Sequence, residues 1–373
     1  MPPIQRYIAF LSLLLALSAK ITSGFSLLGL SSDGPKALTH SAFSQPTKQG
    51  FHLDALPSSP SDCNEDLVAL ESPSRRAFTT SAVPAAIASV LFPFFPGKLL
   101  SSPAYAALLS GPVTVIGANG RTGYECVKAL QARGVSVRAC TRTGQFRGED
   151  TKGLESLACD VTQETTIAPV VKGASAVIFA ASASKEGGTP AVVDNAGLVS
   201  VAKACIDAKV KSLVIISSGA VTKPSSPVFL FLNLFGKIME EKVKGEDAVR
   251  TMYAAGTPAE QQGLSYTIVR PGGLTEEESL GSAAELELNQ GDTKSGRIAR
   301  ADVANICVEA LYYPELTGRT TFECYNADTG APLASVGVSN ILKAKTDKDN
   351  FVSGRECRGD TWKELFMRLE KDS

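Results

Sequence analysis

The sequence predicts an α/β fold in which one doubly wound parallel sheet forms a single mature domain. From Pro112 onward, short β-branched strands alternate with helical segments, which is the pattern of parallel sheets covered by helices. The first strand runs directly into a glycine-rich turn and then into a helix, the order that a phosphate-binding turn requires. No internal repeat interrupts the alternation.

Seven strands and four helices follow from this alternation. The predicted strands are Val113–Ile116, Val135–Cys140, Leu154–Cys159, Ala176–Ala180, Ser212–Ser217, Ser265–Val269 and Thr320–Cys324. The predicted helices are Thr122–Arg133, Val192–Ala208, Leu234–Ala255 and Asp302–Leu311.

Composition excludes several classes of function. The 373 residues are 44% hydrophobic and 20% charged with a net charge of −1, so no basic surface points to a nucleic-acid partner. His40 and His52 are the only histidines and precede the first strand, which excludes a histidine base, triad or metal ligand in the domain. The eight cysteines form no C-x-x-C pair, so most are interpreted as small buried apolar residues and no metal site is expected.

The first hundred residues have the features of targeting segments. An apolar run from Ile8 to Ala19 follows Arg6 and is too short to span a bilayer, so residues 1–24 are interpreted as a signal peptide. The following Thr22-Ser23-Gly24-Phe25 resembles the cleavage site of plastid proteins in algae with secondary plastids of the red lineage. Residues 25–73 are rich in Ser, Pro, Ala and Gly and are interpreted as a plastid transit segment, although they contain more acids than such segments usually do.

Residues 74–106 have the layout of a second address. The pair Arg75-Arg76 precedes an uncharged run from Thr79 to Gly97, and Ala104-Tyr105-Ala106 is a small-x-small cleavage motif. This layout resembles a twin-arginine thylakoid transfer signal, which implies that the mature domain is in the thylakoid lumen. The need for a supply of NADP in the lumen counts against this interpretation of the arginine pair. The alternative is a chance arginine pair before an uncleaved anchor or a stromal linker. Cleavage after Ala106 leaves a mature domain, 107–373, that does not span a membrane.

The turn after the first strand predicts a dinucleotide site. Glycines let the backbone approach a pyrophosphate, and the free N–H groups of the following helix attract it. A plain strand-to-helix turn is the alternative. The candidate cofactor-binding residues of this turn are Gly117, Asn119, Gly120, Arg121, Thr122 and Gly123.

The residues after the second, third and fourth strands refine the cofactor. NAD-binding domains place an acid after the second strand, but this chain has Arg142, which with Arg121 favours the 2′-phosphate of NADP. The alternative for Arg142 is a solvated charge at a strand end. Asp160 and Val161 follow the third strand, where Asp160 is also placed to cap the next helix. The small residues Ala181 and Ser182 let a cofactor cross the sheet edge.

These motifs resemble those of the NmrA-like NAD(P)-binding proteins among the atypical short-chain dehydrogenase/reductases (SDRs), including plastid members. The spacing G-x-x-G-x-x-G is that of extended and atypical SDRs, and the likeness covers roughly Pro112 to Phe322. The further motifs that carry it are Ile215–Gly219, Asn233–Gly236, Lys242, Tyr266–Leu274 and Arg300–Ala304. The resemblance implies that Asp160 and Val161 contact the adenine of the cofactor.

The resemblance breaks at the usual SDR catalytic pair. An ordinary SDR has a Tyr four residues before a Lys on the helix after the fifth strand, and this chain has Lys242 but Ile238. The candidate catalytic residues are therefore Lys242 and Ser218, which stands with Ser217 where the SDR serine is expected. Lys242 is also a candidate to hold the nicotinamide ribose. The alternative for Lys242 is an exposed helix lysine without a role in the site. The alternative for the serine is that its hydroxyl only bonds backbone groups at the end of the strand.

Three features lie further along the chain. The resemblance implies that Pro271, Gly272 and Gly273 form a turn close to the nicotinamide. The polar stretch from Thr275 to Lys294 is interpreted as a lid or substrate loop, with Glu276, Glu277 and Glu278 as a solvated face. The amphipathic segment Thr361–Leu369 is expected to be a helix that caps the domain or meets a partner.

Two functions remain open at this stage. One is an NADPH-dependent oxidoreductase of the plastid acting on a small molecule, in which Lys242 and a serine or water replace the missing Tyr. The other is a non-catalytic NADP-binding protein that senses redox state or assists the assembly of photosystems through a plastid protein partner.

Overall fold

The computed structural model describes residues 109–149, 152–255, 263–333 and 353–373. Their centre is a nine-stranded sheet whose parallel part has the order β3-β2-β1-β4-β5-β6-β11, extended by the antiparallel strands β8 and β13. The strands are β1 (Val113–Ile116), β2 (Val137–Thr141), β3 (Leu154–Ala158), β4 (Ala176–Phe179), β5 (Ser212–Ile216), β6 (Ser265–Pro271), β8 (Leu286–Asn289), β11 (Thr320–Asn326) and β13 (Glu356–Cys357). The predicted doubly wound fold is confirmed.

The strand order reverses at β1, which creates the switch point of the sheet. Val113 lies opposite Val137 of β2 on one side and opposite Ala176 of β4 on the other. Chains that leave β1 and β4 at their carboxyl ends therefore diverge to opposite faces, which opens a crevice where dinucleotides bind in this class of sheet.

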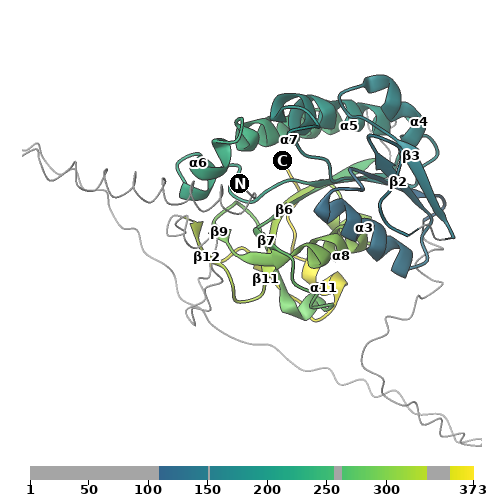
Figure 1. Ribbon diagram of the computed structural model, residues 1–373. Coiled ribbons are helices and arrows are strands. Elements are labelled where there is room, and N and C mark those ends of the chain that lie inside the picture. The colour runs from purple at the N-terminus through teal and green to yellow at the C-terminus, as the bar shows by residue number, and fades with distance from the viewer. Residues whose placement is uncertain (1–108, 150–151, 256–262, 334–352) are drawn as a thin grey trace, which may run out of the picture. The chain divides into compact units, whose positions relative to one another are not determined.

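Helices cover both faces of the sheet (Figure 1). Residues of α3 (Arg121–Ala132) and α8 (Arg300–Ala310) pack in one apolar cluster with Val113 and Val115. Residues of α4 (Ile167–Val171), α5 (Leu198–Asp207) and α7 (Ile238–Ala255) pack with Ile116 in a second cluster. Successive strand residues point to opposite faces, so the buried apolar run of β1 supplies both cores.

Shorter elements complete the described part. Two small sheets pair β7 with β10 and β9 with β12. These strands are β7 (Gly273–Thr275), β9 (Lys294–Ser295), β10 (Arg297–Ala299) and β12 (Ala331–Pro332). The remaining helical segments are η1 (Glu164–Thr166), the π-helix η2 (Ala191–Gly197), α6 (Pro227–Asn233), η3 (Ala283–Glu285), α9 (Pro314–Thr317) and α11 (Trp362–Phe366).

The helix expected over Leu234–Ala255 is wrong in its first turn. Residues 234–237 separate α6 from α7, and both Gly236 and Lys237 have a positive φ, at 73° and 63°. Left-handed residues cannot continue a right-handed helix. The expected helix over Val192–Ala208 is present, but its first part is the π-helix η2.

The interpretation of Thr275–Lys294 as a lid is also wrong in part. Within it, β8 is completely buried and pairs with β11 in the main sheet. The tail helix expected over Thr361–Leu369 is present as α11. It begins with a capping box between Thr361 and Glu364, and its Leu365 and Phe366 are fully buried in the core. The tail therefore caps the domain.

Two further predictions concern cysteines and membranes. The seven cysteines of the described residues are buried, which confirms the prediction for most of them, and all seven are free. No helix in the described residues has the length and apolar character needed to cross a membrane. The three segments interpreted as targeting signals, 1–24, 25–73 and 74–106, lie outside the described residues.

Candidate dinucleotide site

A cavity of about 490 Å³ opens at the carboxyl ends of β1, β2, β3 and β4. This is the switch point at which doubly wound sheets bind their ligands. Eight of the predicted cofactor-binding residues line it: Gly117, Asn119, Gly120, Arg142, Asp160, Val161, Ala181 and Ser182.

The glycine turn is held in a form that only glycines allow. Gly117 has a φ of 84°, and a Cβ there would lie 2.7 Å from the amide nitrogen of Ala181 in the β4 loop. A Cβ on Gly123 would come within 2.3 Å of the Gly117 carbonyl oxygen. The turn therefore packs directly against α3 and β4, and the backbone of this wall is open to a ligand.

The amino terminus of α3 faces this turn without a side-chain cap. No side chain caps the helix at Gly120, and its first turn has no acidic residue. The backbone N–H groups of Arg121, Thr122 and Gly123 belong to that first turn, where a helix leaves its donors unsatisfied. Such a terminus attracts phosphate through these donors and the helix dipole.

The side chains of Asn119 and Arg121 are already engaged by other residues. The Asn119 amide donates to the Gln145 carbonyl at 2.8 Å and accepts from the Arg147 amide at 2.9 Å, which braces the loop after β2. The Arg121 guanidinium is 2.9 Å from Glu276, which also binds Arg300 at 2.7 Å. Glu276 is exposed, but it is not merely a solvated charge, because it joins the first residues of α3 and α8.

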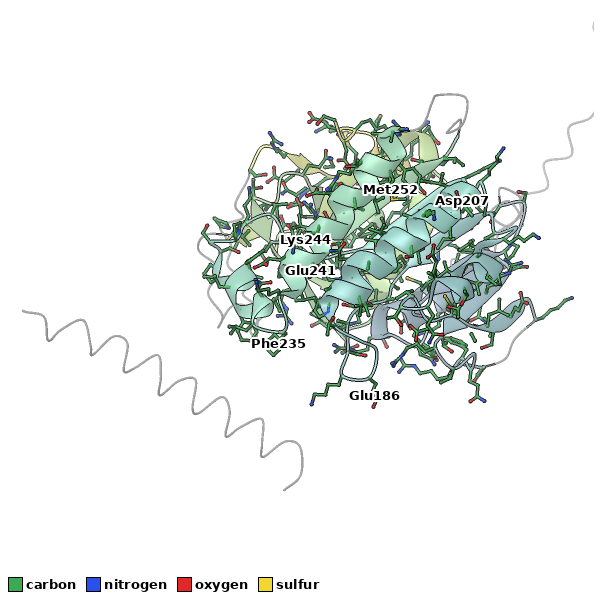
Figure 2. All side chains as sticks on the ribbon, turned by 90° about the horizontal axis from the view of Figure 1, so that it is seen from above. Glu186, Asp207, Phe235, Glu241, Lys244 and Met252 are labelled. Carbon is green, nitrogen blue, oxygen red and sulfur yellow. The ribbon has the colours of Figure 1, made fainter. Side chains whose placement is uncertain are left out.

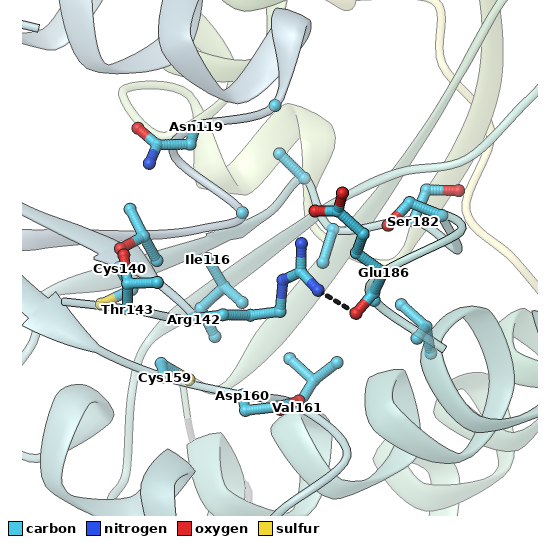
Figure 3. A pocket seen from close by; sticks show the side chains of 18 residues that line it. Ile116, Asn119, Cys140, Arg142, Thr143, Cys159, Asp160, Val161, Ser182 and Glu186 are labelled. Carbon is cyan, nitrogen blue, oxygen red and sulfur yellow. Dashed lines mark hydrogen bonds between the residues drawn. The ribbon is translucent and has the colours of Figure 1, made fainter. Parts of the chain in front are cut away.

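Arg142 extends from the end of β2 across the cavity (Figure 3). Its guanidinium donates to the main-chain carbonyl of Glu186 in the loop after β4. Gly187 of the same loop also lines the cavity. The arginine is therefore held at the cavity by one main-chain bond and keeps further donors for an anionic group.

Asp160 bonds to its own chain in a local turn. Its carboxylate accepts from the amide of Thr162 at 3.0 Å and from its hydroxyl at 2.8 Å. The next helix, η1, begins only at Glu164 and has no side-chain cap, so the alternative that Asp160 caps it is wrong. Asp160 and Val161 line the cavity beside Cys159, and their contact with the adenine stays a prediction. Burial raises the pKa of the Cys159 thiol to about 11, so it is a neutral wall and not a nucleophile.

Neither candidate catalytic residue lines the cavity. Lys242, on α7, forms an ion pair with Asp194 at 2.7 Å. The Ser218 hydroxyl donates to the carbonyl of Gly219 at 3.1 Å. Ile238 is the first residue of α7, one turn before Lys242, so the usual place of the SDR tyrosine is at the very start of this helix.

The structure has no separate turn at Pro271, Gly272 and Gly273. Pro271 ends β6, Gly273 starts β7, and none of the three lines this cavity, so their place near the nicotinamide stays a prediction. A Cβ on Gly272 would lie 2.4 Å from the Gly296 carbonyl oxygen and 2.7 Å from the Tyr325 ring. This glycine is needed for close packing against the β9–β10 connection.

Sequence reasoning missed the contribution of the loop after β4 to the cavity. This part of the lining comes from Ser184, Glu186 and Gly187, and Val193 of η2 adds to it. The adjacent pair Gly187-Gly188 was the available signal, since paired glycines mark a backbone that turns close to another group. Because no strand or helix precedes these residues immediately, periodicity does not indicate them.

The fold and the cavity together define a dinucleotide-binding domain of the Rossmann class. The profile of the NAD(P)H-binding family matches residues 117–314. The chain belongs to this NAD(P)H-binding family of oxidoreductase-like proteins.

Relatives of known name extend this comparison. An uncharacterized chloroplastic protein of Arabidopsis thaliana is 32% identical over 231 residues, which cover 58% of this chain and 78% of the relative. Protein TIC 62 of the A. thaliana chloroplast is 27% identical over 248 residues, covering 60% of this chain and 37% of that protein. Sanguinarine reductase of Eschscholzia californica is 28% identical over 251 residues, covering 56% and 86%.

Proposed function

We propose that this protein binds NADP(H) in the cavity, with the 2′-phosphate at Arg142. The residues present fit the cofactor, because a Cβ would fill the backbone cradle at Gly117 and because the α3 amino terminus is uncapped. The observation that carries the preference for NADP is the guanidinium of Arg142 at the cavity, where an NAD-binding domain has an acid. Arg121 forms an ion pair with Glu276, so it would contact the 2′-phosphate only after this ion pair breaks.

The role that these contacts favour is a non-catalytic one, in which the protein senses NADPH or assists the assembly of photosynthetic complexes. Ile238 replaces the proton-donating tyrosine, and Lys242 is engaged by Asp194. The bound cofactor would supply a hydride, but no described tyrosine takes the place of Ile238 on α7 beside Lys242. The chloroplast relative TIC 62 supports a role in the plastid.

The second candidate is an NADPH-dependent oxidoreductase that acts on a small plastid molecule. In that case Lys242 with Ser218, or with a bound water, would replace the tyrosine. The relationship to sanguinarine reductase favours this candidate, because a member of the same group of relatives is named as a reductase.

We also propose that residues 1–106 deliver the domain to a plastid. The chloroplastic relatives support a plastid location. In this proposal, residues 1–24 are a signal peptide, residues 25–73 are a transit segment and residues 74–106 are a twin-arginine-like signal. Amino-terminal sequencing of the protein isolated from its host tests this order. A terminus near Ala107 supports lumenal processing, and one near residue 74 supports the stroma.

The cofactor and the role are tested on one sample. Fluorescence titration with NADPH and with NADH measures the two dissociation constants, and NADPH oxidation is then followed against quinones, aldehydes and enones. Tight NADPH binding without turnover supports the sensing or assembly role. Turnover that Lys242→Ala abolishes establishes the reductase, whereas failure to bind either nucleotide contradicts the cofactor assignment.

A further inference from the structure

Asp194 is a completely buried carboxylate to which two distant parts of the chain are bonded. The Ser182 hydroxyl donates to its Oδ1 at 2.7 Å, and the Ala183 amide donates to its Oδ2 at 2.9 Å. The Lys242 ammonium lies 2.7 Å from Oδ1, and its side chain is 12% exposed. A charge at this depth is stable only when it is paired and hydrogen-bonded, and all three contacts meet that requirement.

The backbone places Asp194 between the cavity and α7. Asp194 lies within the π-helix η2, and its neighbour Val193 lines the cavity. A Cβ on Gly245 of α7 would lie 2.6 Å from the Asp194 carbonyl oxygen, so this glycine lets the two helices approach closely. Short π-helical segments occur frequently at functional sites, where the extra residue re-aims side chains.

A second contact joins the same two helices without reaching the cavity. The Asn195 amide donates to Glu241 at 2.8 Å, one residue along each helix from the Asp194–Lys242 pair. Glu241 also binds Lys244 at 2.6 Å. Figure 2 shows Glu241 and Lys244 together on α7, where Lys244 is exposed and Glu241 is buried. The Asn195–Glu241 contact is therefore a control for the packing of η2 on α7 without a link to the cavity.

Ser182 and Ala183 follow β4, and Ser182 lines the cavity. The Asp194 carboxylate therefore connects Lys242 directly to the cavity wall. We infer that Asp194 is a positioning residue which fixes this wall, and that Lys242 acts on dinucleotide affinity through Asp194 and not by proton transfer. The inference rests on the proposed function, because it takes the cavity to be the dinucleotide site.

The test is a double-mutant cycle on the full chain, read out as the dissociation constant for NADPH. The variants are Asp194→Asn, Lys242→Met and the double variant, with Asn195→Ala as the control. Each single variant is expected to weaken NADPH binding at least fivefold. The double variant is expected to be no weaker than the worse single one, since both act through one contact. Asn195→Ala is expected to change the constant less than twofold.

Three results overturn the inference. Penalties that multiply in the double variant show that Asp194 and Lys242 act separately, and an equal loss in Asn195→Ala shows that helix packing alone is responsible. If turnover exists, a fall in kcat with unchanged KM in Lys242→Met assigns the lysine to the chemistry, whereas a raised KM with unchanged kcat supports positioning.

Two further readouts keep the test interpretable. Asp194→Asn leaves Lys242 without its partner, whereas the double variant leaves no unpaired buried charge. If Asp194→Asn fails to fold for this reason, the NADPH affinity of the double variant is compared with that of Lys242→Met alone. Failure of the wild-type chain to bind NADPH contradicts the proposed function itself, and it is recognised before any variant is made. If the wild-type chain does not bind NADPH but the double-mutant cycle in melting temperature still shows coupling between Asp194 and Lys242, the contact is structural only, which also overturns the inference.

Discussion

Gly123 packs so closely on Gly117 that a Cβ on Gly123 would come within 2.3 Å of the Gly117 carbonyl oxygen. The atom in the way is main chain, so relief would require the glycine turn itself to move. The first turn of α3 and the glycine turn therefore form one rigid unit, and the geometry of the proposed pyrophosphate site depends on a residue that does not line the cavity.

Gly123→Ala is expected to destabilise the protein by about 1–3 kcal/mol, the usual cost of overpacking, and to remove dinucleotide binding. Thermal unfolding and NADPH titration measure the two effects. Gly273→Ala is the matched control for stability, because its Cβ would meet nothing closer than 3.5 Å. Equal melting temperatures for the two variants would contradict the packing argument.

Arg142→Ala is expected to weaken NADPH binding by about 10- to 100-fold and to leave NADH binding nearly unchanged. The loss corresponds to hydrogen bonds from a charged donor to phosphate, worth about 1.5–3 kcal/mol. Arg147→Ala serves as the control, because the Arg147 guanidinium lies over the Tyr124 ring, 4.8 Å from its centre. A parallel loss for both nucleotides would place Arg142 away from the 2′-phosphate.

The parallel strands and the glycine turn could be predicted from the sequence because local residues determine them. β1 has the predicted bounds, and β2 to β5 end within a residue of their predicted ends. β1, β4 and β5 are buried runs rich in β-branched residues, which is the local signal of a central parallel strand, whereas the edge strand β3 is largely exposed and has no β-branched residue. The spacing of the glycines predicted the tight backbone at Gly117 and Gly123, because the steric demands of such a turn act over a few neighbouring positions.

The rest of the fold and site depends on partners that are distant in sequence. β8 reads as a polar loop because Glu287 and Asn289 are charged or polar, yet both are buried. Glu287 is neutralised by Lys294 and by Arg358, which is 71 residues away. The Lys242–Asp194 contact likewise joins separate helices. No local pattern reveals such pairs, because either residue alone looks like a surface charge.

Glu323 provides a prediction for the dependence of stability on pH. Burial, aided by the nearby Asp292 charge, raises the pKa of Glu323 to about 7, although Arg270 opposes the shift. The folded state therefore holds this proton more tightly than the unfolded chain, in which the pKa is about 4.3. The contribution of Glu323 to stability is greatest below the unfolded pKa and falls as pH rises towards 7.

Glu323→Gln is expected to remove that fall, which amounts to at most about 1.4 kcal/mol per pH unit between pH 5 and 7. Urea unfolding at pH 5, 6, 7 and 8 measures the slope in both proteins. The exposed Glu155 offers a control, since Glu155→Gln should leave the slope unchanged. Parallel stability curves for wild type and Glu323→Gln would show that Arg270 keeps the carboxylate ionised throughout.

Arg133 and Glu309 form a buried ion pair between the end of α3 and α8, at 2.8 Å with side chains 7% and 2% exposed. Burial raises the pKa of Glu309 despite the Arg133 charge, so the carboxylate is already costly to keep ionised. Arg133→Met is expected to destabilise the protein by about 3–5 kcal/mol in urea unfolding at pH 8, because it leaves a buried charge unpaired.

Lys128→Met is the control, because it breaks an exposed ion pair with Glu125 on the same helix and should cost less than about 1 kcal/mol. The double variant Arg133→Met/Glu309→Leu should recover most of the loss, since it replaces both charges by apolar groups. A double variant as unstable as Arg133→Met would show that the pair matters for packing and not for its charge.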